Sequence, residues 1–334
     1  MRFSVGVGLT NACDLACAHC YRDTGQLDEL TLAQVVAVCD SLPVRSVNLG
    51  TGENGLHPRY AEIVDALAAR GVKLSVTSNG FTLEQSTDET LKKFSEVEVS
   101  IDFPTEREQD AFRGPGNWAR AMAAIERARR LGVTVTMLSV MMKPNHTRLA
   151  AIAGLAFGAG ANYRVNVYQP VKTDAFTLTY DEYWDGFRRL LGATRLVSTT
   201  EPLLNAVLGD PFGRGSGCGR ETVRVTPRGD VIPCVYWTKS DVRLADLTRL
   251  GADVLGSRQF EQARTVPDAC RGCAFVTTCQ GGCAGRRALA GDVGRPDPYC
   301  PFIRGDRITL DWRLAEGREL LKSGSACTTV LAPR

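Results

Sequence analysis

The fold of this 334-residue chain is constrained most by a regular alternation of two kinds of segment between residues 3 and 191. Segments rich in Val, Ile and Thr are typical of buried strands, and the amphipathic segments between them are typical of helices. Six such units predict a parallel sheet with crossover helices, because parallel strands need long connections. We expect strands at residues 3–9, 44–49, 72–77, 97–101, 133–140 and 163–168, and helices at 32–42, 60–69, 88–94, 118–131, 148–157 and 181–191.

Six units are too few for a closed barrel of eight strands. A partial barrel and an open doubly wound sheet both fit this periodicity. We predict the first of these, an α/β fold with a partial (β/α)6 TIM-like barrel and a small cysteine-rich domain after it. In both folds ligands bind where the carboxyl ends of the strands meet, so functional residues are expected there.

The composition excludes several kinds of partner. The net charge is only +3 and no dense Lys/Arg block is present, so neither nucleic acid nor an anionic membrane surface is an expected partner. The N-terminus has no signal or transit character, and no apolar run reaches the roughly 18 residues of a membrane span. We therefore expect a soluble, cytoplasmic protein. Disulfides are rare in that compartment, so most of the 12 cysteines are expected to bind metal.

Three cysteines crowd the loop that follows the first predicted strand. Cys13, Cys17 and Cys20 have the spacing Cys-x3-Cys-x2-Cys, and an aromatic residue, Tyr21, comes next. Three thiolates on a short loop can hold three irons of a cubane cluster and leave the fourth iron without a protein ligand. An open metal position is typical of a chemically active site, whereas a closed structural site uses all of its ligands. The loop therefore predicts a reactive iron–sulfur cluster.

Polar and glycine-rich turns follow the next three predicted strands. Because parallel strands place their carboxyl ends at one edge of a sheet, these turns should lie beside the cysteine loop. The shared location of all three turns is stronger evidence for a functional site than any one of them, since polar turn residues often only cap helices. The turns are Gly50-Thr51-Gly52-Glu53, Ser78-Asn79-Gly80 and Ser100-Ile101-Asp102.

The cysteine spacing and these turns together resemble the radical S-adenosylmethionine (SAM) enzymes, and the resemblance extends through the N-terminal half of the chain. It implies that Cys13, Cys17 and Cys20 hold a 4Fe–4S cluster whose fourth iron is chelated by the amino and carboxylate groups of SAM. It also implies the mechanism. One electron from the cluster cleaves the sulfonium of SAM, and the resulting 5′-deoxyadenosyl radical takes a hydrogen atom from the substrate.

The same resemblance assigns the SAM-binding residues. Thr51, Gly52 and Glu53 look like the family's Gly-Gly-Glu motif, which receives the amino group of SAM, although Thr51 stands where a glycine is usual; the alternative is an ordinary tight turn. Arg113 resembles an arginine that many relatives use on the SAM carboxylate, and its alternative is a solvated loop arginine. Weaker matches are Ser78, Asn79, Ser100 and Asp102, which would line the ribose and methionine moieties, and Tyr21, whose backbone would lie near the adenine, whereas His19 is expected to pack.

Seven further cysteines form a second system in the C-terminal part. Four of them lie in a run, Cys-x2-Cys-x5-Cys-x3-Cys, that taken alone could also be a zinc site. The whole set is similar to the SPASM extension of radical SAM proteins, which carries auxiliary 4Fe–4S clusters and so implies three clusters in all. By the family's interleaving, one auxiliary cluster would be held by Cys270, Cys273, Cys279 and Cys300, and the other by Cys218, Cys234 and Cys283.

The second of these sets has only three thiols. Some relatives supply an eighth cysteine soon after the first, but residues 219–231 contain none. This cluster would have either an open iron or a fourth ligand that is not a cysteine, and the sequence does not decide between them. The two remaining cysteines stand apart from both sets. Cys39 shares a helical face with apolar residues and is expected to be a buried hydrophobe, while Cys327 lies in a small-residue tail and is expected to be a loose end of the chain.

Tyr236 is the candidate catalytic residue. Many oxidising relatives place an acidic base directly after the cysteine equivalent to Cys234, but here Val235, Tyr236 and Trp237 follow. Tyr236 could donate a proton or a hydrogen atom, although an aromatic side chain beside a cluster more often only packs.

We expect four regions along the chain. Residues 1–195 would form the radical SAM partial barrel, and residues 196–217, which carry Thr, Pro and Gly, would be a connector. Residues 218–303 would form the SPASM auxiliary-cluster domain, beginning with a hairpin and ending in a cysteine-dense segment that needs metal to become ordered. Residues 304–334 would be a C-terminal helix, at 306–321, and a tail.

Relatives with a SPASM extension differ in what they modify. Most act on peptides or proteins, others dehydrogenate or epimerise aminocyclitols and sugars, and still others act in haem-type cofactor synthesis. We expect a radical SAM oxidoreductase or maturase of a natural-product pathway that oxidises, crosslinks or epimerises a ribosomal peptide, with a small polyol as the alternative substrate. An electron donor such as flavodoxin or ferredoxin and a separate leader-binding protein are the expected partners. The rival class is a non-enzymatic iron–sulfur electron carrier or a zinc-stabilised binding module, which would need neither Glu53 nor Arg113.

Overall fold

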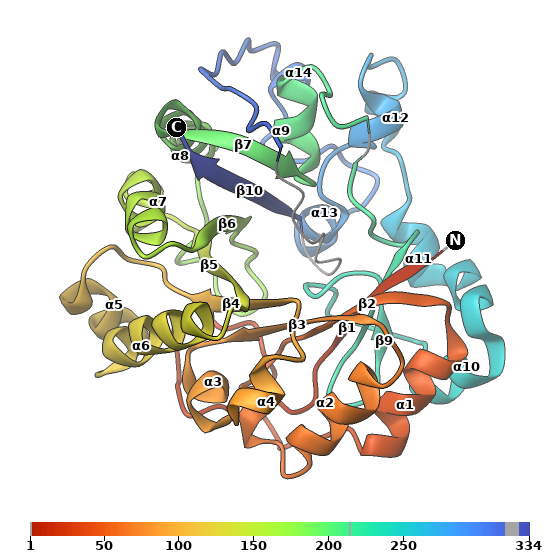
Figure 1. Cartoon of the computed structure of the whole chain (residues 1–334). Coiled ribbons are helices and arrows are strands. Elements are labelled where there is room, and N and C mark those ends of the chain that lie inside the picture. The colour runs from red at the N-terminus through yellow and green to blue at the C-terminus, as the bar shows by residue number, and fades with distance from the viewer. Residues whose placement is uncertain (1, 214, 318–326) are drawn as a thin grey trace.

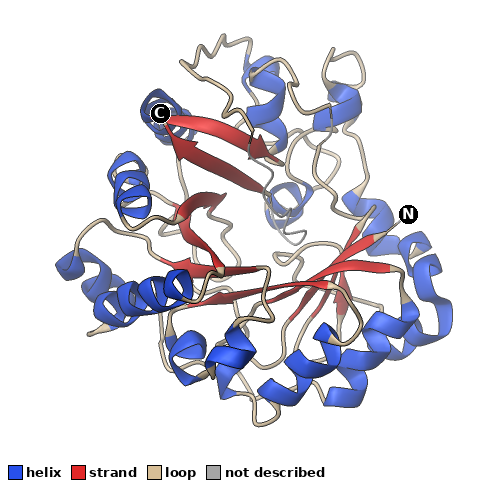
Figure 2. Cartoon of the chain, in the orientation of Figure 1, coloured by secondary structure: helices blue, strands red, loops and turns tan. Residues whose placement is uncertain are grey.

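The computed structural model describes residues 2–213, 215–317 and 327–334. Within these residues one sheet of ten strands runs in the order β7-β10-β6-β5-β4-β3-β2-β1-β8-β9. The sheet curves into an open barrel, and helices lie along its outer side (Figures 1 and 2). None of the described helices has the length and apolar character needed to cross a bilayer.

The six predicted strands are present, and their bounds differ from the predicted ones by at most two residues. Neighbours among them pair in parallel, as the crossover helices require. Polar and apolar residues alternate in several of these strands, and polar members such as Asn48, Thr77 and Glu98 line the cavity inside the barrel. The strands are β1 (Phe3–Val7), β2 (Val44–Leu49), β3 (Lys73–Ser78), β4 (Glu96–Ser100), β5 (Thr134–Met141) and β6 (Asn162–Val167).

The six predicted helices are also present, with two short helices between them. Helix α1 begins where Thr31 and Gln34 cap each other's backbone amides, at 2.8 and 3.2 Å, so two of the unpaired N–H groups of its first turn are satisfied. The helices are α1 (Leu32–Ser41), α2 (Tyr60–Ala68), α3 (Phe81–Gln85), α4 (Asp88–Leu91), α5 (Glu106–Arg113), α6 (Asn117–Arg130), α7 (Leu149–Gly158) and α8 (Tyr180–Ala193), with a 3-10 turn η1 at Asn54–Leu56.

The C-terminal part adds short elements to the same sheet. The predicted hairpin forms from β8 (Thr222–Val225), which pairs in parallel with β1, and β9 (Val231–Ile232). The division of the chain near residue 218 stays a prediction, since β8 continues the sheet of the barrel. The remaining elements here are α10 (Leu244–Leu250), η2 (Gly251–Gly256), α11 (Arg258–Ala263), η3 (Asp268–Cys270), α12 (Val276–Cys279), α13 (Ala284–Leu289) and α14 (Pro301–Arg304).

Two expectations about irregular and helical segments were wrong. The predicted connector contains β7 (Thr194–Thr199) at its start, and α9 (Pro202–Val207). The predicted helix at 306–321 is not helical over residues 306–317, and residues 318–321 lie outside the described residues. Its backbone bonds to β7 instead: Leu196 donates to the Arg313 carbonyl and Ala315 donates to the Leu196 carbonyl, both at 2.8 Å. Hydrogen bonds to a strand hold this segment extended, so it cannot also be a helix.

The predicted tail also contains a strand. Strand β10 (Thr328–Pro333) lies between β6 and β7 and is antiparallel to both. It is the dark blue arrow beside β7 in Figure 1. Its sequence, Thr-Thr-Val-Leu-Ala-Pro, is short and β-branched, and a strand was not predicted because Pro and small residues flank it. The C-terminal residues are therefore part of the barrel wall.

The register of the sheet aligns the carboxyl ends of the early strands. Val7 lies opposite Leu49, Ser78 opposite Val99, and Ser100 opposite Leu138. The apolar members of these pairs are buried. The segments that leave β1, β2, β3 and β4 therefore emerge around one mouth of the barrel, as expected for a parallel α/β barrel.

Candidate active site

The three-cysteine loop lies at this mouth and is held by its neighbours rather than by regular structure. Arg22 donates to the Asn11 and Leu15 carbonyls at 2.5 and 2.7 Å. The Asn11 side chain bonds the Gln26 carbonyl at 2.8 Å and the Asp28 amide at 3.0 Å. These bonds close the loop at both ends, so the thiols between them have fixed positions.

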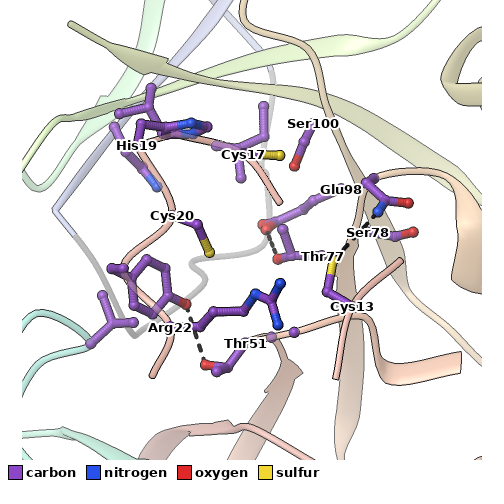
Figure 3. Close-up of a pocket in the computed structure, with 18 of the residues that line it drawn as sticks. Cys13, Cys17, His19, Cys20, Arg22, Thr51, Thr77, Ser78, Glu98 and Ser100 are labelled. Carbon is purple, nitrogen blue, oxygen red and sulfur yellow. Dashed lines mark hydrogen bonds between the residues drawn. The ribbon is translucent and has the colours of Figure 1, made fainter. Parts of the chain in front are cut away.

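The thiols of Cys13, Cys17 and Cys20 are free of disulfides and line one cavity. Figure 3 shows their sulfur atoms facing the same space. Burial raises the pKa of the Cys13 thiol to about 11 and also raises the pKa of Cys17. Thiolates in this place therefore need a cationic partner, and iron supplies one.

The donor set fits a cluster better than a single ion. Among the described residues, no three His, Cys, Asp or Glu side chains converge closely enough to bind one metal ion. A cubane places each of its cysteine ligands on a different iron, so its thiolates surround a shared space without meeting at one point. Three free thiols around one cavity have that arrangement, and we conclude that the residues present fit a 4Fe–4S cluster.

The carboxylate of Glu53 organises two of the predicted turns. It is 1% exposed and accepts hydrogen bonds from the Ser78 and Thr82 hydroxyls, from the Asn79 amide at 2.9 Å and from the Thr82 amide at 2.8 Å. Burial raises the pKa of Glu53, and these donors oppose the rise. The turn after β2 and the turn after β3 are thus joined through one side chain.

Gly52 and Thr51 shape the turn beside Glu53. Gly52 has a φ of 62°, and a Cβ there would lie 2.4 Å from the Thr10 carbonyl oxygen, so only glycine fits. Thr51 has a φ of 85°, a value that costs a β-branched residue about 1–2 kcal/mol. Thr51, which stands where the family usually has a glycine, therefore strains the backbone of this turn.

Ser78 and Asn79 line the cavity and also hold the turn that leads into α3. Asn79 accepts a hydrogen bond from the Phe81 amide at 2.9 Å, just before α3, and donates to Asp14 of the cysteine loop at 2.8 Å. Ser78 accepts from the Gly80 amide at 2.8 Å. The same two residues thus stabilise the turn and line the cavity.

Asp102 and Arg113 form a buried pair, of which only Arg113 lines the cavity. Arg113 donates from Nε and Nη2 to one Asp102 oxygen at 2.8 and 2.7 Å. Burial raises the pKa of Asp102, but Arg113 and His19 outweigh it and hold the pKa below its ordinary value. Asp102 thus lies behind Arg113 and not on the predicted SAM-facing wall, while Ser100 does line the cavity.

His19 and Tyr21 take different places beside the cysteines. The His19 ring stacks on Phe112 with centroids 5.1 Å apart, as expected for a packed side chain. Tyr21 meets Tyr236 edge to face at 5.6 Å, and its hydroxyl lies 3.3 Å from that of Thr51. Tyr236 lines the same cavity, so the candidate catalytic residue is brought to the cysteine loop.

Several residues of the cavity wall were not predicted. Arg224 on β8 is buried and donates to Thr51 at 2.7 Å. Glu98 on β4 accepts from Thr77 at 2.6 Å and from Arg164 at 2.5 Å. The sequence contained a signal that could have predicted Glu98. Glu96 and Glu98 alternate with valines in a predicted strand, and residues two apart in a strand face the same side of the sheet.

The seven later cysteines occupy two places. Cys300 lies within electrostatic reach of Cys270, Cys273 and Cys279, so the structure brings the first predicted set together. Burial raises the pKa of Cys279 to about 12, which again favours a cationic partner. The second predicted set, Cys218, Cys234 and Cys283, forms another group, in which Cys234 contacts Cys218 and lies near Cys283.

The expectation for Cys327 was wrong. Its thiol is buried and hydrogen-bonds to the thiols of Cys218 and Cys283. Its partners are more than forty residues away in sequence, so spacing along the chain gave no sign of this contact. Only the insertion of β10 between β6 and β7 brings Cys327 to them.

A buried ion network supports this second group. Arg286 lies 2.6 Å from Asp297 and 2.8 Å from Glu201 on their carboxylate oxygens. Asp297 also accepts from the Cys283 amide at 2.9 Å. The residue Glu201 precedes α9, so the network ties the cysteine-rich segment to the barrel.

Known proteins with similar sequences and folds were found. Residues 7–153 match the model of the Radical SAM superfamily. The mycofactocin maturase MftC of Mycobacterium tuberculosis is 28% identical over 319 residues, which cover 87% of this chain and 81% of the relative. The PqqA peptide cyclase of Gluconobacter oxydans is 25% identical over 322 residues, covering 87% and 88%.

Two solved structures share the fold. Streptococcus suis SuiB bound to S-adenosylmethionine matches with a TM-score of 0.66 at 13% identity, over 90% of this chain and 77% of SuiB. The structure described as native anSMEcpe with bound AdoMet and Kp18Cys peptide matches with a TM-score of 0.69 at 14% identity, over 91% and 95%. The partial barrel with a cysteine-rich C-terminal part is therefore confirmed as the architecture.

Proposed function

We propose that the chain is a radical SAM enzyme that uses SAM and a 4Fe–4S cluster, and that it is a maturase that modifies a ribosomally made peptide. When bound and reduced, the cluster and SAM supply a carbon-centred radical that takes a hydrogen atom from the substrate. The side chains described above would bind, orient and enclose these groups.

Cys13, Cys17 and Cys20 would hold the SAM-binding cluster. Hydrogen bonds from Arg22 and Asn11 hold the loop that carries these three cysteines. Such bonds would lower the ordering cost of binding a cluster.

The turn at Thr51, Gly52 and Glu53 would receive the amino group of SAM. The four hydrogen bonds to Glu53 fix its carboxylate, so its role is to hold the backbone of the turn in place as well as to supply charge. Arg113, with Nε and Nη2 bound to Asp102, would present its remaining edge to the SAM carboxylate. Ser78, Asn79 and Ser100 would line the rest of SAM, and Tyr21 would lie near the adenine.

The observation that favours a peptide is a second cavity that adjoins the first. The two cavities share Tyr21, Arg22, Thr51, Arg224 and Val235, and the second continues past Pro227 and Trp237. A small polyol would need only the inner cavity, whereas an extended chain would need both. Relatives with similar sequences are named as a peptide cyclase and a maturase, and one solved relative of the fold is SuiB bound to precursor peptide SuiA.

Two amide side chains on the inner wall suit a peptide backbone. The Asn166 and Gln169 side-chain oxygens are buried and have no hydrogen-bond partner among the described residues. A buried acceptor without a partner costs about 1–3 kcal/mol, which a bound N–H group would relieve. Tyr236, edge to face with Tyr21 at the junction of the cavities, would then lie beside the modified residue as the donor of a proton or hydrogen atom.

The later cysteines would bind two auxiliary 4Fe–4S clusters that accept electrons from the oxidised substrate. Cys270, Cys273, Cys279 and Cys300 would hold one, and Cys218, Cys234 and Cys283 would belong to the other. An external donor such as flavodoxin or ferredoxin would reduce the SAM-binding cluster, and a separate leader-binding protein would deliver the peptide.

Anaerobic reconstitution tests the function. The loaded chain, SAM and dithionite are incubated with synthetic peptides from genes adjacent to its own, and mass spectrometry follows both 5′-deoxyadenosine and the peptide. A change in peptide mass that depends on SAM supports the proposal. Formation of 5′-deoxyadenosine with turnover of an aminocyclitol or sugar, and not of any such peptide, would contradict the peptide assignment.

A further inference from the structure

Cys327 is fixed in space by the strand that follows it. The next residue, Thr328, starts β10 and pairs with Asn166 of β6. Its amide donates to the Thr200 hydroxyl at 3.0 Å, and its carbonyl accepts from the Thr200 amide at 2.8 Å. These bonds hold the residue next to Cys327, so the backbone of Cys327 is anchored on its C-terminal side by the fold.

Those contacts complete a chain of four thiols. Cys327 hydrogen-bonds to Cys218 and to Cys283, and Cys218 hydrogen-bonds to Cys234. All four are buried and none is in a disulfide. They come from four separate segments: the approach to β8, the exit of β9, the start of α13 and the start of β10.

The backbone of Gly285 packs closely against the thiols. A Cβ there would lie 3.3 Å from the Cys234 sulfur and 3.9 Å from the Cys283 sulfur, so a side chain at this position would press on the group. Its other walls include Ala263, Ala284 and Ile232. Arg286 and Arg287 lie within electrostatic reach of Cys283 and favour its thiolate. Metal is the partner that all four thiols can share.

We propose that Cys327 is the fourth protein ligand of the auxiliary cluster held by Cys218, Cys234 and Cys283. The inference rests on the proposed function for the existence of that cluster and adds a ligand from the last strand of the barrel. On binding, the Cys327 thiol loses its proton to solvent and its sulfur forms one bond to the fourth iron. The cluster then has no open iron, so it passes electrons and does not bind substrate.

The test isolates the auxiliary clusters in the full chain. In a background with Cys13, Cys17 and Cys20 changed to Ala, the chain is reconstituted and should carry about eight irons, as two 4Fe–4S clusters require. Cyanide is then added to the dithionite-reduced chain, and the electron paramagnetic resonance spectrum is recorded. With four cysteine ligands on each cluster, the spectrum should not change. A cyanide-dependent shift would show an open iron and overturn the proposal.

Removing the ligand gives the opposite expectation. In the same background, Cys327→Ala should lose about one iron to give a 3Fe–4S signal, or keep four irons and become sensitive to cyanide. Cys39→Ala is the matched control and should change neither reading, because Cys39 lies alone on α1. Unchanged iron content and cyanide insensitivity in Cys327→Ala would overturn the proposal. If Cys327→Ala does not fold, the cyanide result on the background chain still decides.

The two proposals fail separately. Absence of auxiliary iron in the background chain would remove the Cys327 ligand, while SAM cleavage by the natural chain would still support the proposed enzyme. If the natural chain does not cleave SAM but the background chain still carries eight irons, the proposed enzyme is contradicted while the auxiliary clusters, and with them the Cys327 ligand, remain supported.

Discussion

Arg224 donates a hydrogen bond from Nη2 to the hydroxyl of Thr51 at 2.7 Å, and Thr51 holds a backbone φ of 85°. Arg224 lies on β8, in the C-terminal part, whereas Thr51 belongs to the turn after β2. A strained turn at the predicted SAM site is thus held from the strand that leads toward the auxiliary cysteines. This bond links the two halves of the chain at the mouth of the barrel.

The link can be measured by a double-mutant cycle. Hydrogen bonds to charged groups contribute about 1.5–3 kcal/mol, so Arg224→Met and Thr51→Gly should couple by about 1–2 kcal/mol in the free energy of unfolding. Arg224→Met alone should also weaken SAM binding, since the turn loses its anchor. Arg220→Met, at an exposed position nearby, is the control and should leave both values unchanged. Additive single effects would contradict the link.

Glu53→Gln should destabilise the site although the two side chains have nearly the same size and shape. An amide replaces one acceptor oxygen with a donor that faces hydroxyl and amide donors, and each unsatisfied buried group costs about 1–3 kcal/mol. SAM affinity, measured by isothermal calorimetry on the loaded chain, should fall at least tenfold. The exposed residue Glu126 offers the control change Glu126→Gln, which should have no effect. Wild-type SAM affinity in Glu53→Gln would show that the turn does not depend on this carboxylate.

Asp102→Asn should leave Arg113 as a buried charge without its carboxylate. Breaking a buried ion pair costs about 3–5 kcal/mol, and SAM binding should weaken because Arg113 loses its orientation. The folded-state pKa of Asp102 is lowered, so its stabilising contribution is present above its unfolded pKa of about 3.9 and is lost as the pH falls below that value. The difference in unfolding free energy between Asp102→Asn and the natural chain should therefore be constant from pH 7 to 5 and shrink below pH 4. A difference that shrinks between pH 7 and 5 would contradict this assignment.

Arg286→Met should unfold the cysteine-rich segment before the barrel. It removes the ion-pair partner of the buried carboxylates of Glu201 and Asp297, at a cost of about 3–5 kcal/mol. Hydrogen exchange should rise in residues 268–304 and auxiliary iron content should fall. Arg295→Met removes an exposed pair with Asp292 and should change little. Equal effects of the two changes would show that the buried network is not what holds the segment.

The sequence predicted what depends on local pattern. The six strands were predictable because β-branched runs alternate with amphipathic segments, and the location of Cys13, Glu53 and Ser78 followed from parallel topology alone. The segment 306–317 was not predictable in this way, because its backbone bonds to β7 through contacts with Leu196 that are distant in sequence. Cys327 was missed for the same reason.

Residue roles were harder to predict than residue positions. Asp102 and Arg113 were both assigned to SAM from their matches, and only side-chain geometry shows that one lies behind the other. Arg224 carries no motif, since a single arginine in a valine-rich strand does not reveal its partner. Glu98 could have been found, because a charge that recurs every second residue in a buried strand indicates an inward-facing polar wall.

The central claim is that the three-cysteine loop generates radical chemistry from SAM. The direct measurement is 5′-deoxyadenosine released by the reconstituted chain with SAM and dithionite, compared with the chain in which Cys13, Cys17 and Cys20 are Ala. The account predicts 5′-deoxyadenosine from the natural chain and none from the triple variant, whose auxiliary clusters stay loaded. Equal release of 5′-deoxyadenosine by both chains would contradict it.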